Sequence, residues 1–246
     1  MGLSERLAPA LALPLAALLA LSACATRPRS DELELRVIRK TGVEAAYSYT
    51  VEYPAFPGHP EPTRLAARLA DEAVARFVGE ATANRKAWEA TASREELAAG
   101  RPPFELAFSW RAERLSPEAV SILFESYSFV GGAHGALELA ALNYDPRARR
   151  LLGLADLLEG AGPDWLEALS RAARARLEAE LGREPGYRLD EAARKWIEEG
   201  TAPEPGNFSL FTFGPADLTI RFKPYQVAPW SAGSPGISLP RDARKW

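Results

Sequence analysis

The chain has 246 residues, a formal net charge of −3 and 47% hydrophobic residues. This length allows one large or two small domains, with enough apolar residues for a hydrophobic core. The slightly negative charge argues against nucleic acid as a partner, because nucleic-acid binding requires a basic surface.

The first 23 residues predict a lipoprotein signal peptide. Arg6 supplies a positive charge, and the apolar run 11–21 is too short for a comfortable membrane span. The run ends in Leu21-Ser22-Ala23-Cys24, which resembles the bacterial lipobox, where a peptidase cuts before a cysteine whose thiol then carries lipid. Cys24 is the only cysteine, so no internal disulfide can form, and acylation would remove a free thiol. The alternative is an ordinary secretory signal with a chance cysteine.

We therefore predict that residues 24–32 form a lipidated tether, with acyl chains such as palmitate on Cys24. Several chains are needed for stable anchoring, because one chain binds a membrane only marginally. In lipoproteins of this type an aspartate after the cysteine favours retention in the inner membrane, whereas this chain has Ala25 there. The expected location is the cell envelope, at the periplasmic face of an outer membrane.

The segment after the tether predicts a hairpin followed by a long helix. Residues 33–40 and 46–53 alternate apolar and polar side chains, which is typical of half-buried strands. The proline-rich segment 54–62 predicts a loop. From Thr63, a candidate helix cap, apolar residues recur at helical spacing, and the helix is expected to continue past Trp88.

The middle of the chain predicts three strands joined as an antiparallel meander. Residues 104–115 alternate with period two, residues 119–129 are rich in strand-forming residues, and residues 136–144 follow a glycine-rich loop. A single helical turn is expected at 154–158.

The last third predicts helices and then strands. A helix opens at Pro163 and ends near Leu181, and Asp190 is a candidate cap for a second helix. Residues 207–213 and 218–222 predict a hairpin, and residues 237–239 a last short strand. This order indicates an α+β fold, with antiparallel sheet or sheets, helices packed on one side, and two strand–helix halves.

We divide the chain into a strand–helix–strand region at 33–129 and a C-terminal domain at 130–242. Composition alone does not decide whether the two halves are separate small domains or one continuous sheet. No internal repeat of solenoid period is present.

Several short segments recur in the order and spacing of a known family. They are Phe129-Val130-Gly131-Gly132-Ala133-His134-Gly135, Asn143-Tyr144-Asp145, Leu154-Ala155-Asp156-Leu157-Leu158, Asn207-Phe208, Phe222-Lys223-Pro224-Tyr225-Gln226-Val227-Ala228-Pro229 and Ile237-Ser238-Leu239-Pro240. Residues 130–240 thereby resemble a widespread bacterial family, domain of unknown function 3298. The preceding region resembles the partner domain that often accompanies it. Residues 230–233 depart slightly from the family's usual tyrosine–alanine version.

The resemblance implies a place in the envelope. Members of the family are lipoproteins, ectodomains of lysozyme-binding anti-sigma factors, and accessory domains of peptidoglycan deacetylases. It implies recognition of a muramidase or a glycan. It does not imply catalysis, because the deacetylase chemistry belongs to a separate domain.

His134 has a catalytic and a structural interpretation. A general base would need a nucleophile and an orienting carboxylate at hydrogen-bond range. Ser126, Ser128, Asp145 and Asp156 are available only by residue type. The structural alternative, which we favour, is that the ring nitrogens of His134 hold the glycine loop in place.

The sequence predicts neither a metal nor a cofactor. A zinc site usually requires three or four ligands, mostly histidine and cysteine. The chain offers His59 and His134, and Cys24 is assigned to the lipid. No aspartate-rich loop suggests calcium.

The predicted ligand-binding residues are Gly131, Gly132, His134, Tyr225 and Trp230. Tyr225 and Trp230 lie among prolines near Phe222. Aromatic residues in such a setting can form a surface that stacks on sugars or docks a protein, because flat rings offer contact area at low entropic cost. They can equally belong to a loop that is pinned to the core.

Three classes of function remain open. The first is a lipid-anchored, non-catalytic module that binds a lysozyme-like protein or cell-wall peptidoglycan. The second is an enzyme acting on an envelope polymer, which would need paired carboxylates such as Glu125 and Glu138 in a cleft. The third is a structural or assembly lipoprotein without a small-molecule site.

Overall fold

The computed structural model describes residues 33–158 and 162–240. The predicted signal peptide, the tether and Cys24 lie outside these residues. In the described part of the chain, no helix is both long and apolar enough to cross a membrane. The described strands form a six-stranded sheet, β1-β2-β3-β4-β5-β6, and a three-stranded sheet, β7-β8-β9. The predicted α+β class is confirmed.

The first hairpin forms as predicted. Strand β1 (Arg36–Val43) pairs antiparallel with β2 (Tyr47–Ala55). Strand β3 (Phe104–Leu115), however, pairs with β2 in parallel. Parallel neighbours need a crossover connection. Helix α1 (Pro60–Thr91) and the short helix α2 (Arg94–Ala99) provide it, so this pair departs from the predicted antiparallel arrangement.

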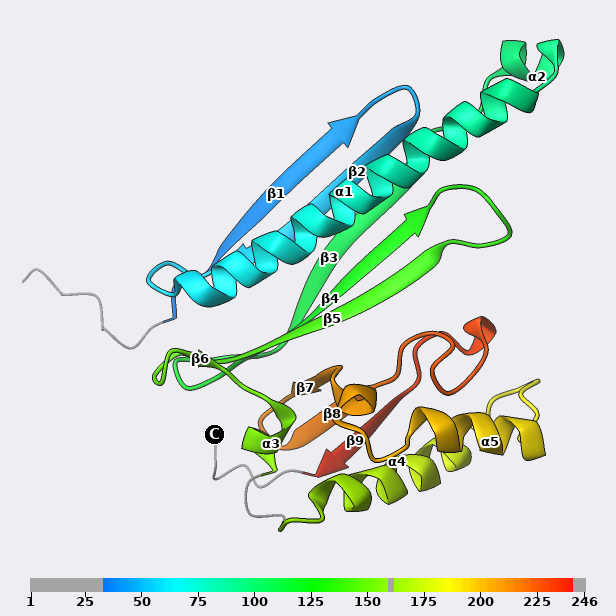
Figure 1. Ribbon diagram of the computed structural model, residues 1–246. Coiled ribbons are helices and arrows are strands. Elements are labelled where there is room, and N and C mark those ends of the chain that lie inside the picture. The colour runs from blue at the N-terminus through cyan, green and yellow to red at the C-terminus, as the bar shows by residue number, and fades with distance from the viewer. Residues whose placement is uncertain (1–32, 159–161, 241–246) are drawn as a thin grey trace, which may run out of the picture. The chain divides into compact units, whose positions relative to one another are not determined.

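The meander is also confirmed. Strands β3, β4 (Val120–Phe129) and β5 (Ala136–Asp145) pair antiparallel in sequence order. The short strand β6 (Arg150–Leu151) closes the far edge. The glycine loop therefore joins two long strands and lies at one end of the sheet (Figure 1).

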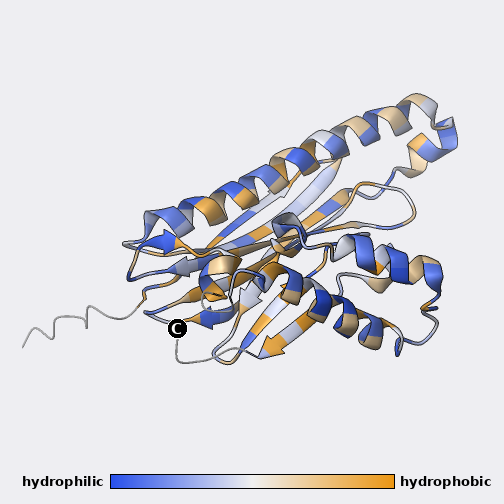
Figure 2. Ribbon diagram, turned by 60° about the horizontal axis from the view of Figure 1, so that its bottom comes forward, coloured by the Kyte–Doolittle hydropathy of each residue, from blue (hydrophilic) through white to orange (hydrophobic). Residues whose placement is uncertain are grey.

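Helix α1 covers one face of the six-stranded sheet (Figure 1), and its small residues explain how it lies there. Its buried positions include Ala66, Ala70 and Ala73, which pack against large strand residues such as Phe108 and Phe124. Short side chains let the helix axis approach the sheet closely. The other side of the helix carries polar residues, so hydrophilic and hydrophobic positions alternate along it (Figure 2).

The predicted cap of α1 is wrong by one turn. The helix begins at Pro60, with His59 at the N-cap position. Prolines fit the first turn because the amide protons that they lack would have no partner there. Thr63 lies inside this turn, where its Oγ1 accepts a hydrogen bond from the Phe56 amide at 2.8 Å and donates to the His59 carbonyl at 3.0 Å.

The C-terminal elements build a second core. Helices α3 (Leu154–Leu157), α4 (Trp165–Leu181) and α5 (Glu191–Gly200, capped by Asp190 as predicted) precede β7 (Phe211–Phe213), β8 (Asp217–Arg221) and β9 (Gly236–Pro240). The predicted strand 207–213 begins only at Phe211, because residues Pro205–Phe208 form a 3-10 turn, η1. The buried residues of α4 and α5 pack with those of the three-stranded sheet. These residues are Leu169, Ala173, Leu177, Leu181, Ile197, Phe213, Ile220 and Ile237.

A buried polar connection joins the two sheets. The side chain of Asn143 on β5 donates from Nδ2 to the Phe211 carbonyl at 2.8 Å, and the Phe213 amide donates to Ser121 Oγ at 2.8 Å. Arg221, whose side chain is 17% exposed, forms an ion pair with Glu113 on β3 at 3.3 Å. Strand β7 is thus held by specific hydrogen bonds to the strands of the larger sheet.

Candidate functional site

The glycine loop between β4 and β5 depends on glycine for its shape. Gly131 and Gly132 have φ angles of 93° and 104°, a region that side chains with a Cβ rarely adopt. Gly135 is needed for space, since an added Cβ would lie 2.3 Å from the Tyr127 ring. Gly131 and Gly132 were predicted as ligand-binding residues; the structure gives them a conformational role in the loop that carries His134.

His134 is fixed on two sides. Its Nδ1 donates a hydrogen bond to the Gly135 carbonyl at 2.9 Å, as the structural alternative predicts. Its ring also stacks on Trp230, with ring centroids 4.4 Å apart and an interplanar angle of 27°. Trp230 begins a short 3-10 turn, η2 (Trp230–Ala232), directly after Pro229. Two predicted site residues that are far apart in sequence therefore meet in space.

The geometry does not assemble a hydrolytic triad around His134. Asp145 lies at the opposite end of β5, about 30 Å away along a strand of this length. Its Oδ1 accepts hydrogen bonds from the amides of Arg147 and Ala148. Asp156 is engaged with Arg150 and with the Gly153 amide at the start of α3.

Glu125 and Glu138 do not form a carboxylate pair. In the register of β4 and β5, Glu138 lies opposite Ser126, the neighbour of Glu125, so the two carboxylates point to opposite faces of the sheet. Each is neutralised separately: Glu125 by Arg111 at 2.5 Å, and Glu138 by Arg76 on α1. The arrangement that a glycosidase requires is therefore not realised by these residues.

Tyr225 combines a fixed backbone with an exposed ring. Its φ angle of 67° is unusual for a residue with a side chain, and 55% of the residue is exposed. The Trp196 indole donates to the Tyr225 carbonyl at 3.0 Å. The next residue, Gln226, donates from Nε2 to the carbonyls of Gly200 and Asn207. The loop is pinned to the end of α5, yet it leaves the tyrosine ring in solvent.

Sequence reasoning missed Tyr127. This residue is 46% exposed on the face of β4 that points away from α1, and its ring covers Gly135. The alternation of side chains along β4 could have indicated this exposed position, because Tyr127 and Phe129 fall on the face opposite to the buried Phe124. We define the aromatic surface as Tyr127, His134 and Trp230, with Tyr225 on the loop that leads into Trp230.

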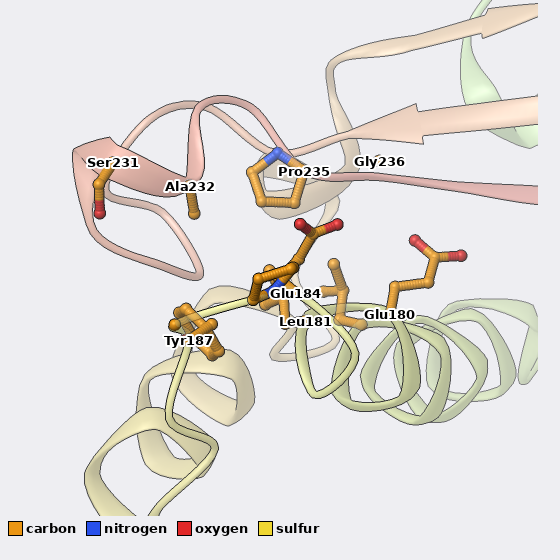
Figure 3. Close-up of a pocket in the computed structure, with 11 residues that line it drawn as sticks. Glu180, Leu181, Glu184, Tyr187, Ser231, Ala232, Pro235 and Gly236 are labelled. Atoms are coloured by element: carbon orange, nitrogen blue, oxygen red, sulfur yellow. The ribbon is translucent and has the colours of Figure 1, made fainter.

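A groove is lined in part by the residues that follow Trp230 in the sequence. It has a volume of about 600 Å³ and lies between the C-terminal end of α4, the loop that follows it, and the segment 231–236 (Figure 3). Ser231, the first lining residue of that segment, follows Trp230 directly. The groove is thus continuous in sequence with the aromatic surface.

The groove has an apolar floor and an acidic rim. Leu177 and Leu181 contribute apolar lining, and Glu180 and Glu184 bring carboxylates. The Tyr187 hydroxyl is buried without a hydrogen-bond partner in the described part of the chain. Burial raises the pKa of the Tyr187 hydroxyl, and the negative charge of Asp190 adds to this effect.

The described residues contain no group of three or more histidine, cysteine, aspartate or glutamate side chains placed to hold a metal ion. His59 is instead packed edge-on against Tyr144, and its Nδ1 lies 3.2 Å from the tyrosine hydroxyl. The two histidines of the chain therefore belong to different environments.

Comparison with known proteins gives two adjacent family matches. Residues 155–242 match a family described as protein of unknown function (DUF3298), and residues 41–136 match the model of deacetylase PdaC. The peptidoglycan-N-acetylmuramic acid deacetylase PdaC of Bacillus subtilis is 29% identical over 199 residues, which cover 81% of this chain and 38% of the relative. The chain thus spans about two fifths of that relative.

Two crystal structures share the fold. A DUF3298 family protein from Pseudomonas aeruginosa is 19% identical with a TM-score of 0.50, and the match covers 85% of this chain and 91% of that one. A member of the same family from Bacteroides fragilis is 17% identical with a TM-score of 0.56, covering 86% and 90%. The predicted resemblance is therefore confirmed: the chain is related to the DUF3298 family and, through its N-terminal region, to deacetylase PdaC.

Proposed function

We propose that this protein is a cell-envelope module that binds a cell-wall glycan through the aromatic surface, without catalysing a reaction. The observation that carries the proposal is the stack of His134 on Trp230, together with the exposed Tyr127 ring that covers Gly135, the residue after His134. Sugar rings present C–H faces that pack on flat aromatic rings. A platform whose rings are already held by neighbours loses little entropy on binding.

The relatives support a cell-wall setting. The Bacillus subtilis relative is a deacetylase of peptidoglycan N-acetylmuramic acid, and this chain matches about two fifths of it. A region shared with a larger cell-wall enzyme is well suited to hold polymer. Deacetylation of an amide-linked sugar also exposes an amine, so such glycans carry positive charges.

The proposed attachment is a lipid on Cys24, which would hold the module at the envelope through the tether 24–32. This part of the proposal rests on the lipobox-like sequence alone. A module tethered in this way would meet peptidoglycan from the membrane side, at the periplasmic face of an outer membrane where the organism has one.

The test is sedimentation of the purified full chain with intact peptidoglycan sacculi. We expect co-sedimentation that Trp230→Ala and Tyr127→Ala each reduce. The matched control is Leu115→Ala, which removes an exposed apolar side chain (41% exposed) at the opposite end of β3. Circular dichroism checks that all variants fold.

A parallel arm measures binding to immobilised lysozyme. Binding to lysozyme alone, lost in the same two variants, would replace the glycan by a protein partner. Absence of binding to both ligands would contradict the proposal and favour the assembly role. Release of sugar or acetate from the sacculi would contradict the proposal that the protein is non-catalytic. It would instead support an enzyme that acts on an envelope polymer.

A further inference from the structure

Among the described residues, the acidic rim of the groove, Glu180 and Glu184, lacks the ion pairs that three other glutamates of α4 and α5 form. On α4 and α5, Glu178 pairs with Arg194, Glu198 with Arg174, and Glu199 with Lys195. Within the described part of the chain, Glu180 and Glu184 have no such partner. No lysine or arginine is among the described residues that line the groove.

The two carboxylates face the groove together. Glu180 lies in the last turn of α4, and Glu184 lies in the turn that follows, where its amide donates to the Leu181 carbonyl at 3.1 Å. Figure 3 shows both carboxylates rising from this side toward the segment that carries Pro235 and Gly236. Two negative charges over an apolar floor of leucine and proline favour a ligand that is both cationic and partly apolar.

We propose that this groove binds a de-N-acetylated amino sugar, with its ammonium group at the carboxylates of Glu180 and Glu184 and its ring against the apolar floor. This inference rests on the proposed function and names the ligand class within it. A sugar whose amine is acetylated has no charge to offset the desolvation of two carboxylates, so it would bind less well.

The position of the groove fits a polymer that occupies both sites. Trp230 belongs to the aromatic surface, and the next residues, Ser231 and Ala232, line the groove. A glycan strand stacked on the aromatic surface could therefore place a neighbouring sugar between Glu184 and Pro235. The aromatic surface would hold any glycan, and the groove would select for the free amine.

The experiment compares two probes that differ only in acetylation. Binding of a glucosamine tetramer and of an N-acetylglucosamine tetramer to the purified full chain is measured by calorimetry at low and at physiological salt. We expect the glucosamine tetramer to bind about tenfold more tightly at low salt. Added salt should reduce this preference, because the two carboxylates are exposed.

The decisive variant is Glu180→Gln/Glu184→Gln, which keeps the shape of the side chains and removes both charges. It should abolish the preference and leave binding of the acetylated tetramer unchanged. The matched control is Glu44→Gln/Glu167→Gln, which removes the same charge from two exposed glutamates outside the groove. This control should keep the preference.

The outcomes separate the two proposals. Equal binding of both tetramers would overturn the amine site and leave glycan binding intact. Absence of binding to both tetramers and to sacculi would overturn both. A preference that survives Glu180→Gln/Glu184→Gln would place the amine elsewhere and overturn the assignment. Lysozyme, a basic protein, is a further probe. If its binding depends on these glutamates and the two tetramers bind equally, the assignment of the groove to an amino sugar is also overturned.

Discussion

Ser121 donates a hydrogen bond of 2.6 Å from its Oγ to Oδ1 of Asn143, and both residues are buried between the two sheets. Asn143 also donates to the Phe211 carbonyl, and Ser121 accepts from the Phe213 amide. The pair therefore satisfies backbone groups of β7 that would otherwise be buried without partners. The Asn143-Tyr144-Asp145 segment, first noted as a family motif, thus has a structural role.

We expect Asn143→Ala to lower the free energy of unfolding by about 2–3 kcal/mol, because it leaves buried polar groups unpaired. Chemical denaturation followed by circular dichroism measures the change. Ser109→Ala on β3, an exposed serine, should have almost no effect. A loss of less than about 0.5 kcal/mol for Asn143→Ala would mean that water or a rearranged chain replaces these hydrogen bonds.

His59 should make stability depend on pH. Burial and the positive charge of Arg149 lower the pKa of His59 below its ordinary value of 6.5. Just below pH 6.5, His59 therefore binds a proton more readily in the unfolded chain than in the folded chain. The contribution of His59 is present above pH 6.5 and is lost as pH falls through 6.5 toward the lower folded pKa.

The measurement is the free energy of unfolding as a function of pH for the natural chain and for His59→Gln. The glutamine cannot titrate, so the difference between the two curves isolates the histidine. We expect the difference to shrink as the pH is lowered below 6.5. A difference that stays constant over this range would contradict the lowered pKa.

Gly200→Ala should damage the C-terminal loop. An added Cβ at Gly200 would lie 2.1 Å from the Gln226 carbonyl oxygen, which is backbone and cannot swing away. We expect a loss of about 1–3 kcal/mol as the loop that carries Tyr225 shifts away from α5. Thermal unfolding measures the loss, with Gly206→Ala as the control because its added Cβ meets open space. Similar melting temperatures for both variants would refute this account.

Tyr225→Gly should separate stability from binding. Glycine tolerates the φ angle of 67° that strains the tyrosine, so the variant should be as stable as the natural chain, or more stable by up to about 1 kcal/mol. Because Tyr225 is exposed, little core contact is lost. Binding to sacculi should nevertheless weaken if the ring contacts glycan. A destabilised variant would indicate that the tyrosine is kept for the fold.

Local patterns predicted the individual elements well. The strand 104–115 and the helix capped by Asp190 were found because alternation and capping are properties of neighbouring residues. The start of α1 was misplaced because Thr63 resembles a cap, whereas two prolines earlier in the turn fit the first helical positions.

The sequence by itself determined the fold class, the order of the elements and the need for glycine in the β4–β5 loop, since these follow from local periodicity and backbone conformation. Only the tertiary structure decided that β2 and β3 lie parallel, that Glu125 and Glu138 face opposite sides, and that His134 stacks on Trp230. These relationships depend on strand register and on contacts between distant segments. The energies that stabilise these relationships come from packing in three dimensions. A pattern of residues along the chain therefore does not predict the relationships.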